Sequence, residues 1–113
     1  MPPYRTEVND TFISIFLEGD LDANSSIQAD EQLSQLMKSG QYRLHFDFTN
    51  VEYISSAGIG VFLSYQDEIS EKGGKMVFSG LRPRVLNVFQ LLGLDQLLEI
   101  TPTSIEALER LKV

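Results

Sequence analysis

The strongest constraint on the fold of this chain is a change of hydrophobic period between residues 42 and 72. Residues 42–48, "YRLHFDF", alternate in polarity, which predicts a β-strand with one buried face and with Arg43, His45 and Asp47 on the other side. From about Ser56 to Lys72 the period becomes that of a helix, which Gly73-Gly74 ends. The residues that share one side of this helix are Ile59, Phe62, Leu63, Gln66 and Ile69.

Four other segments have the composition of strands. Residues 11–17, "TFISIFL", are rich in β-branched and aromatic side chains, and we expect them to pair with a short strand near residues 4–9 across an Asn9-Asp10 turn. Residues 75–81, "KMVFSGL", and residues 97–100, "LLEI", predict two further strands.

Helix-end signals predict three more helices. Ser25 and Gln28 have the spacing of a capping box, and Gly40 stands where a C-terminal cap belongs. We expect this first helix to bury a stripe made of Ile27, Leu33, Leu36 and Met37. Pro83 fits the first turn of a helix that runs to Gly93, and Thr103 with Glu106 predicts the cap of a last helix, "SIEALERL".

The resulting order, ββαβαβαβα, predicts an α/β fold. Strands that alternate with helices form right-handed crossovers and parallel pairs, so we expect a mixed, mostly parallel sheet of about five strands with one antiparallel pair at its start. The alternation in residues 42–48 indicates that helices cover mainly one face. With 113 residues, the chain is expected to form a single domain, 1–113.

Composition and charge exclude several classes of function. No apolar run approaches the roughly 18 residues of a membrane helix, and the N-terminal residues lack the apolar core of a signal peptide, so we expect a cytoplasmic protein without membrane insertion. A net charge of −7 disfavours nucleic acid as a partner. With no cysteine and one histidine, the chain lacks most ligands for zinc or iron, and we expect neither metal nor cofactor.

Residues 51–60, "VEYISSAGIG", place two serines where a strand passes into a helix. One interpretation is structural: a serine caps the helix, and Gly58 and Gly60 permit close packing. Each glycine weakens a helix by about 1 kcal/mol relative to alanine, so packing or a flat surface has to compensate. The functional interpretation is that a serine accepts a phosphoryl group, which a helix N-terminus tolerates.

Catalytic interpretations of the chain are weaker. It has no G-x-S-x-G, G-x-G-x-x-G or P-loop lysine motif. A hydrolase using Ser56 would need His45 as its base, but a histidine in the middle of a strand is more often structural. Asp20 and Asp22 could hold Mg²⁺, yet the segment "EGDLDANSS" is better explained as a turn leading into a capped helix. We therefore expect a protein that is not an enzyme.

Taken in order, three segments resemble the STAS-domain family, specifically bacterial anti-sigma factor antagonists, also called anti-anti-sigma factors. "LEGDLDANS" is similar to the family's G-[ED]-L-D signature, and "HFDFTNVEYISSAGIGVFL" to its strand followed by D-S-[ST]-[GA]-[LI]-G. "GGKMVFSGLRPRVLNVFQLLGLDQLLEI" and "TSIEAL" resemble the closing strands and helices. The resemblance covers nearly the whole chain and implies a STAS-like sandwich.

The resemblance implies a partner-switching mechanism. In unphosphorylated form such proteins bind an anti-sigma factor and free the sigma factor that it held. The anti-sigma factor is typically a serine kinase that phosphorylates the antagonist and thereby ends the binding, and a serine phosphatase resets the system. An alternative is an unphosphorylated STAS interaction module in a signalling or lipid-transport assembly.

Carried onto this chain, the resemblance makes Ser56 the phosphorylation site. Ser55 stands where the family commonly has Asp, which removes a negative charge beside the acceptor and leaves open whether Ser55 is modified instead. Asp22 matches the aspartate of G-[ED]-L-D and is expected close to the acceptor. The implied partner-binding residues are Asp22, Ser55, Ala57, Gly58, Ile59 and Gly60.

Overall fold

The computed structural model describes residues 3–112 and contains five strands, four helices and one 3₁₀ turn. The strands are β1 (Arg5–Val8), β2 (Ile13–Glu18), β3 (Arg43–Asn50), β4 (Lys75–Ser79) and β5 (Glu99–Thr101). The helices are α1 (Ala23–Lys38), α2 (Ser56–Glu71), α3 (Pro83–Leu91) and α4 (Ser104–Leu111), and the 3₁₀ turn is η1 (Leu94–Gln96).

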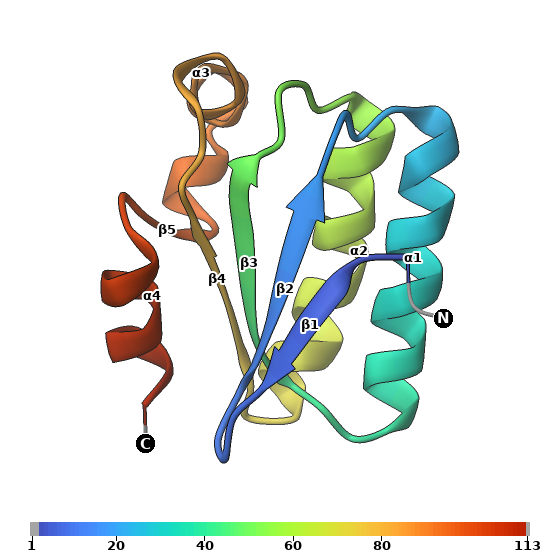
Figure 1. The fold of residues 1–113 in the computed structure, drawn as a ribbon, viewed down its shortest axis with the longest axis vertical. Coiled ribbons are helices and arrows are strands. Elements are labelled where there is room, and N and C mark those ends of the chain that lie inside the picture. The colour runs from blue at the N-terminus through green and yellow to red at the C-terminus, as the bar shows by residue number, and fades with distance from the viewer. Residues whose placement is uncertain (1–2, 113) are drawn as a thin grey trace.

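The five strands form one sheet in the order β1-β2-β3-β4-β5 (Figure 1). β1 and β2 are antiparallel, and every other neighbouring pair is parallel. Parallel pairing brings the carboxyl ends of β2, β3 and β4 to the same edge, where α1, α2 and α3 begin. The predicted mixed, mostly parallel sheet and its antiparallel start are confirmed.

The main hydrophobic core lies between the sheet and helices α1, α2 and α3. Alternate residues of β3 and β4 point into it, and four phenylalanine rings, those of Phe46, Phe48, Phe62 and Phe78, pack there with centroids 5.0–5.8 Å apart. Helices α1 and α2 stand side by side on this face (Figure 1). Phe46 and Phe78 are stacked, and the other pairs make the edge-on and tilted contacts that aromatic rings also favour.

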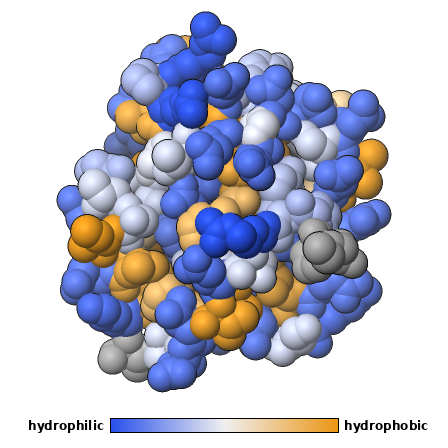
Figure 2. Space-filling model, in the orientation of Figure 1, coloured by the Kyte–Doolittle hydropathy of each residue, from blue (hydrophilic) through white to orange (hydrophobic). Residues whose placement is uncertain are grey.

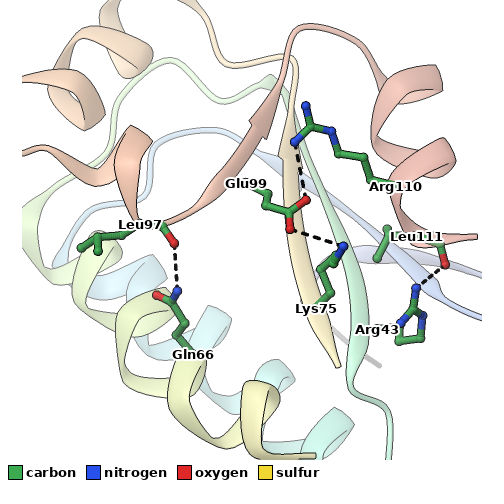
Figure 3. Close-up of polar contacts among 7 residues, drawn as sticks. All are labelled: Arg43, Gln66, Lys75, Leu97, Glu99, Arg110 and Leu111. Carbon is green, nitrogen blue, oxygen red and sulfur yellow. Dashed lines mark hydrogen bonds and ion pairs between the residues drawn. The ribbon is translucent and has the colours of Figure 1, made fainter. Parts of the chain in front are cut away.

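Helix α4 covers part of the opposite face and builds a second, smaller core. The buried residues of this core are Phe12, Val77, Ala107 and Leu111. Figure 3 shows the polar contacts around it: Arg43 Nη2 donates to the Leu111 carbonyl over 2.7 Å, and the Glu99 carboxylate lies between Lys75 and Arg110 at 3.4 and 3.5 Å. A cation at the last carbonyls of a helix complements its dipole, so Arg43 helps to fix the end of α4.

The expectation that residues 42–48 have one buried face is wrong for the centre of the strand. His45 is only 1% exposed because α4 and the neighbouring strands cover it. Its Nδ1 lies 2.9 Å from Ser14 Oγ and its Nε2 lies 2.7 Å from Ser79 Oγ. A polar residue can be buried on this side because both ring nitrogens have hydroxyl partners.

The half of this face that α4 leaves uncovered is polar. Figure 2 shows hydrophilic residues across it, with the hydrophobic ones in separate patches. Here the guanidinium of Arg5 lies 3.9 Å from the ring centroid of Phe16, which is half-buried. This cation–π contact covers an aromatic ring that would otherwise face solvent.

Three local expectations need correction. The capping box of α1 is formed by Asp22 and Ser25, not by Ser25 and Gln28, so the helix begins three residues earlier. Ile27 lies outside the buried stripe and is 61% exposed, because at 3.6 residues per turn it does not share a side of the helix with Leu33 and Leu36. The second strand begins at Ile13 instead of residue 11, because the hairpin turn extends to Phe12, whose carbonyl accepts the N–H of Asn9.

The other predicted boundaries hold within two residues, including the end of the third helix, which was expected at Gly93. That helix ends at Leu91, and the sequence analysis did not predict η1, which follows Gly93 in the left-handed conformation. Within residues 3–112, no helix is both long and apolar enough to span a membrane.

Candidate functional site

The two serines lie at the start of α2 and have different environments. Ser55 is the N-cap: its backbone is extended, and its Oγ accepts the N–H of Gly58 over 3.2 Å. Ser56 is the first helical residue and is exposed, whereas Ser55 is half-buried. The structural interpretation of a capping serine is therefore confirmed for Ser55, and Ser56 presents its hydroxyl to solvent.

The segment before α2 is tied to the segment before α1. The N–H of Ser55 donates to the Leu21 carbonyl, and the N–H of Leu21 donates to the Tyr53 carbonyl, both over 2.8 Å. Leu21 and Ile54 form an isolated parallel bridge and are 0% and 3% exposed. The segments that lead into α1 and α2 consequently lie side by side, joined by these hydrogen bonds and this bridge.

Asp22 is the N-cap of α1. Its Oδ1 accepts the N–H groups of Asn24 and Ser25 over 3.0 and 2.9 Å, and Ser25 Oγ in turn accepts the N–H of Asp22 over 2.9 Å. The hydrogen bonds from Ser25 lower the pKa of the Asp22 carboxyl, since they favour its charged form. These contacts agree with a turn leading into a capped helix, and no group of three metal-binding side chains occurs within residues 3–112.

Gly58 and Gly60 have different reasons to be glycine. A Cβ on Gly58 would lie 3.0 Å from Ile54 Cγ1 and 3.1 Å from the Leu21 carbonyl oxygen, so Gly58 allows α2 to approach the bridge. A Cβ on Gly60 would meet no atom within 4 Å. Packing therefore compensates for the first glycine, while the second leaves a bare surface on the exposed side of α2.

The expected partner-binding residues divide into exposed and buried groups. Asp22, Ala57 and Gly60 are exposed, whereas Gly58 and Ile59 are buried and offer no surface. The sequence analysis missed two exposed apolar side chains at this end of the molecule, Ile27 and Tyr53, which are 61% and 48% exposed. The helical period itself was the missed signal for Ile27, because at 3.6 residues per turn it does not share a side with Leu33 and Leu36.

The sequence analysis also missed Arg82, which holds the loop between β3 and α2 from the other side. Its Nε donates to the Thr49 carbonyl over 2.9 Å, and its Nη1 lies 3.2 Å from the Glu52 carboxylate. The sequence gives only a weak signal for this role of Arg82, namely the two arginines within residues 82–84.

The hydrolase alternative has no support in this geometry. Both ring nitrogens of His45 are occupied by Ser14 and Ser79 on the neighbouring strands. Asp47 Oδ1 accepts the backbone N–H of Thr49 instead of orienting the imidazole. A catalytic triad on Ser56 would need a base within hydrogen-bond reach of its hydroxyl, and His45 does not serve as one.

The fold and the paired helix N-termini define a small α/β domain of the STAS class. The STAS domain model matches residues 4–107, and the chain belongs to the STAS domain family. The anti-sigma-B factor antagonist of Listeria monocytogenes is 31% identical over 88 residues, which are 78% of this chain and 77% of that protein. The anti-sigma-B factor antagonist of Staphylococcus epidermidis is 24% identical over 85% of this chain and 89% of its own length.

Solved structures share the fold. An anti-sigma factor antagonist from Mycobacterium paratuberculosis has a TM-score of 0.86 and 18% identity over 96% of this chain and 92% of its own. The unphosphorylated form of the anti-sigma factor antagonist SpoIIAA has a TM-score of 0.74 and 23% identity over 95% of this chain and 96% of its own. The predicted STAS-like α/β fold is thus confirmed.

Proposed function

We propose that this chain is an anti-sigma factor antagonist whose binding is switched off by phosphorylation of Ser56. The unphosphorylated chain binds an anti-sigma factor that is also a serine kinase, and so releases a sigma factor. A serine phosphatase reverses the modification. The chain acts in the cytoplasm as a single domain, 1–113, and is a binding protein instead of an enzyme. The names of its curated relatives support this class of partner.

The observation that carries the choice of Ser56 is the difference between the two serines. Ser55 Oγ is engaged by the N–H of Gly58, so a phosphate there would remove the N-cap of α2. Ser56 is exposed at the first helical position, and its side chain does not cap the helix. Modification of Ser56 therefore leaves the fold intact, as a reversible switch requires.

In the free protein, the helix N-terminus lowers the free-energy cost of a phosphate on Ser56. A phosphoserine adds about −1.5 to −2 charges, which the unpaired N–H groups and the dipole of α2 favour. In a complex the same charge would lie within the contact, where an unpaired charge costs several kcal/mol. A loss of about 2–3 kcal/mol already weakens binding by about 30- to 150-fold.

The proposed contact surface surrounds Ser56. Ala57, Gly60, Asp22 and the edge of Ser55 face the partner, since each is at least partly exposed. Gly58 and Ile59 support this surface from below, because they pack α2 against the buried bridge and the core.

The test uses the purified chain with each serine-kinase anti-sigma factor from the same organism. We expect ATP-dependent transfer of one phosphate, which peptide mass spectrometry locates on Ser56. Ser56→Ala should bind without release by ATP, and Ser56→Asp should bind at least about 30-fold more weakly by calorimetry.

Ser104 provides a matched control. It is the first residue of α4, is exposed, and follows the N-cap Thr103, so its local geometry repeats that of Ser56. Ser104→Asp should bind like the parent. Tight binding without phosphate transfer would favour the constitutive interaction module, and equal binding by Ser56→Asp and the parent would refute the switch.

A further inference from the structure

β1 is the end strand of the sheet, and a glutamine side chain occupies part of its outer edge. The N–H of Tyr4 donates to Gln32 Oε1, and Gln32 Nε2 donates to the Tyr4 carbonyl, both over 2.9 Å. Gln32 is 7% exposed on α1. Its amide therefore satisfies Tyr4 in the way that a residue of another strand would.

Beyond Tyr4 the outer edge is open. The backbone groups of successive strand residues point to opposite edges, so those of Thr6 and Val8 point the same way as those of Tyr4. The hairpin agrees, because the N–H of Asn9 donates inward to Phe12. Within residues 3–112 no strand pairs with this edge, since β2 is the only neighbour of β1.

A hollow of about 640 Å³ accompanies this edge, between β1 and α1. Its walls include Thr6, Gln32, Gln35 and Leu36. Val8, whose side chain lies on the same face of β1 as Thr6, is 75% exposed. One strand edge thus carries an exposed apolar side chain and lies beside an open space lined mostly by polar residues.

We propose that β1 pairs in antiparallel fashion with β1 of a second copy of this chain, and that the Gln32 amide is a latch that competes with this pairing. Self-association here is independent of the proposed function, because it uses a different edge of the molecule from the start of α2.

Charge complementarity selects the register of this pairing. When the twofold axis passes through Thr6, Arg5 lies opposite Glu7 of the second copy and Glu7 lies opposite its Arg5. Within one chain the two side chains share a face, with Arg5 Nη1 2.8 Å from Glu7 Oε1. A shift of one strand by two residues would place either Glu7 opposite Glu7 or Arg5 opposite Arg5, and directly opposed like charges destabilise a strand pair.

In the register centred on Thr6, Val8 of the second copy lies opposite Tyr4. Its backbone then takes over the two hydrogen bonds that the Gln32 amide makes in the single chain, while its side chain lies on the same side of the sheet as α1. The Gln32 amide and the Val8 backbone of the second copy make equivalent hydrogen bonds to Tyr4, so each replaces the other at little gain in free energy. Dimerisation is therefore weak while the Gln32 amide is present and becomes tighter once it is removed.

The test measures the dimerisation constant of the purified chain, without any anti-sigma factor, by sedimentation velocity. Gln32→Ala should dimerise at least about tenfold more tightly than the parent, because nothing competes at Tyr4. Gln35→Ala is the control, since it lines the same hollow without a hydrogen bond to Tyr4. Gln32→Ala that associates no more tightly than Gln35→Ala would overturn the proposal.

A charge exchange in the Gln32→Ala variant gives a second readout, which tests the register of the strand pair. Arg5→Glu should weaken the dimer of Gln32→Ala by about tenfold, and adding Glu7→Arg should restore it. Circular dichroism and thermal unfolding of each variant identify any that fail to fold. Folded charge variants that leave dimerisation unchanged, or a double exchange that does not restore it, would refute this register and the proposal with it.

Discussion

The hydroxyl oxygen of Ser55 accepts the amide N–H of Gly58 over 3.2 Å, and this hydrogen bond gives two adjacent serines different roles. Ser55 completes the first turn of α2. Ser56, the next residue, contributes little to that turn and faces solvent. A protein that changes partners by phosphorylation needs this separation, because the modified group should not be the one that holds the helix.

Ser55→Ala is expected to lower the free energy of unfolding by about 1 kcal/mol, the usual value of an N-cap. Ser56→Ala should change it by less than about 0.5 kcal/mol, since the side chain is exposed and uncapped. Urea denaturation of both variants measures the difference. Equal effects would mean that the hydrogen bond between Ser55 and Gly58 does not stabilise α2.

The two glycines of α2 predict substitutions of opposite sign. Gly60→Ala should stabilise the protein by about 0.5–1 kcal/mol, because its Cβ meets open space and alanine favours the helix. Gly58→Ala should destabilise it by about 1–3 kcal/mol, since its Cβ would press on Leu21 and Ile54. Thermal unfolding of the two variants measures these effects. A stabilising Gly58→Ala would show that Leu21 and Ile54 shift to accommodate the added methyl group.

His45 predicts a loss of stability on mild acidification. Burial lowers its pKa below the ordinary 6.5, although Asp47 opposes the shift. The folded state therefore binds the proton less tightly than the unfolded chain, so stability is level above about pH 7 and falls as the pH drops below 6.5. The chain has one histidine, so its NMR titration is unambiguous.

The control for this effect is His45→Gln, which keeps hydrogen-bonding capacity without a charge change in this range. Its stability should not show the decline between about pH 7 and pH 5 that the parent shows. A parent histidine that titrates at or above its ordinary pKa would contradict the buried position of the ring.

Asp22 predicts a separable effect on folding and on phosphorylation. Asp22→Asn retains a good N-cap and should be nearly as stable as the parent, whereas Asp22→Ala should be clearly less stable. If Asp22 also helps the kinase, Asp22→Asn should slow phosphate transfer to Ser56 more than it affects folding. Kinase assays beside urea denaturation test this, and equal losses would favour a purely structural role.

The same carboxyl predicts a second pH dependence, at lower pH. Its pKa is lowered in the folded state, so its contribution to stability is present above the ordinary value of 3.8 and is lost as the pH falls through the folded pKa. Asp22→Asn should reduce the slope of acid unfolding below about pH 4.

The sequence alone determined the order of elements, the antiparallel start, the parallel sheet and the position of two serines at a helix N-terminus. These follow from local properties: the hydrophobic period of β3 and α2, the glycines that end helices, and small polar residues before α2. Local signals near one another were ambiguous, and for α1 the choice between Asp22 and Ser25 as cap moved the expected start of the helix by three residues.

Only the tertiary structure decided which polar side chains are buried and which glycine is needed for packing. His45 is buried because α4, more than fifty residues later in the chain, covers its side of β3, and Gln32 is buried because its amide meets Tyr4 on the edge strand. Gly58 and Gly60 look alike in sequence, but only Gly58 faces the bridge between Leu21 and Ile54. The contacts of His45 with α4, of Gln32 with Tyr4 and of Gly58 with Leu21 join residues that are far apart in the chain, so no local period or cap signal encodes them.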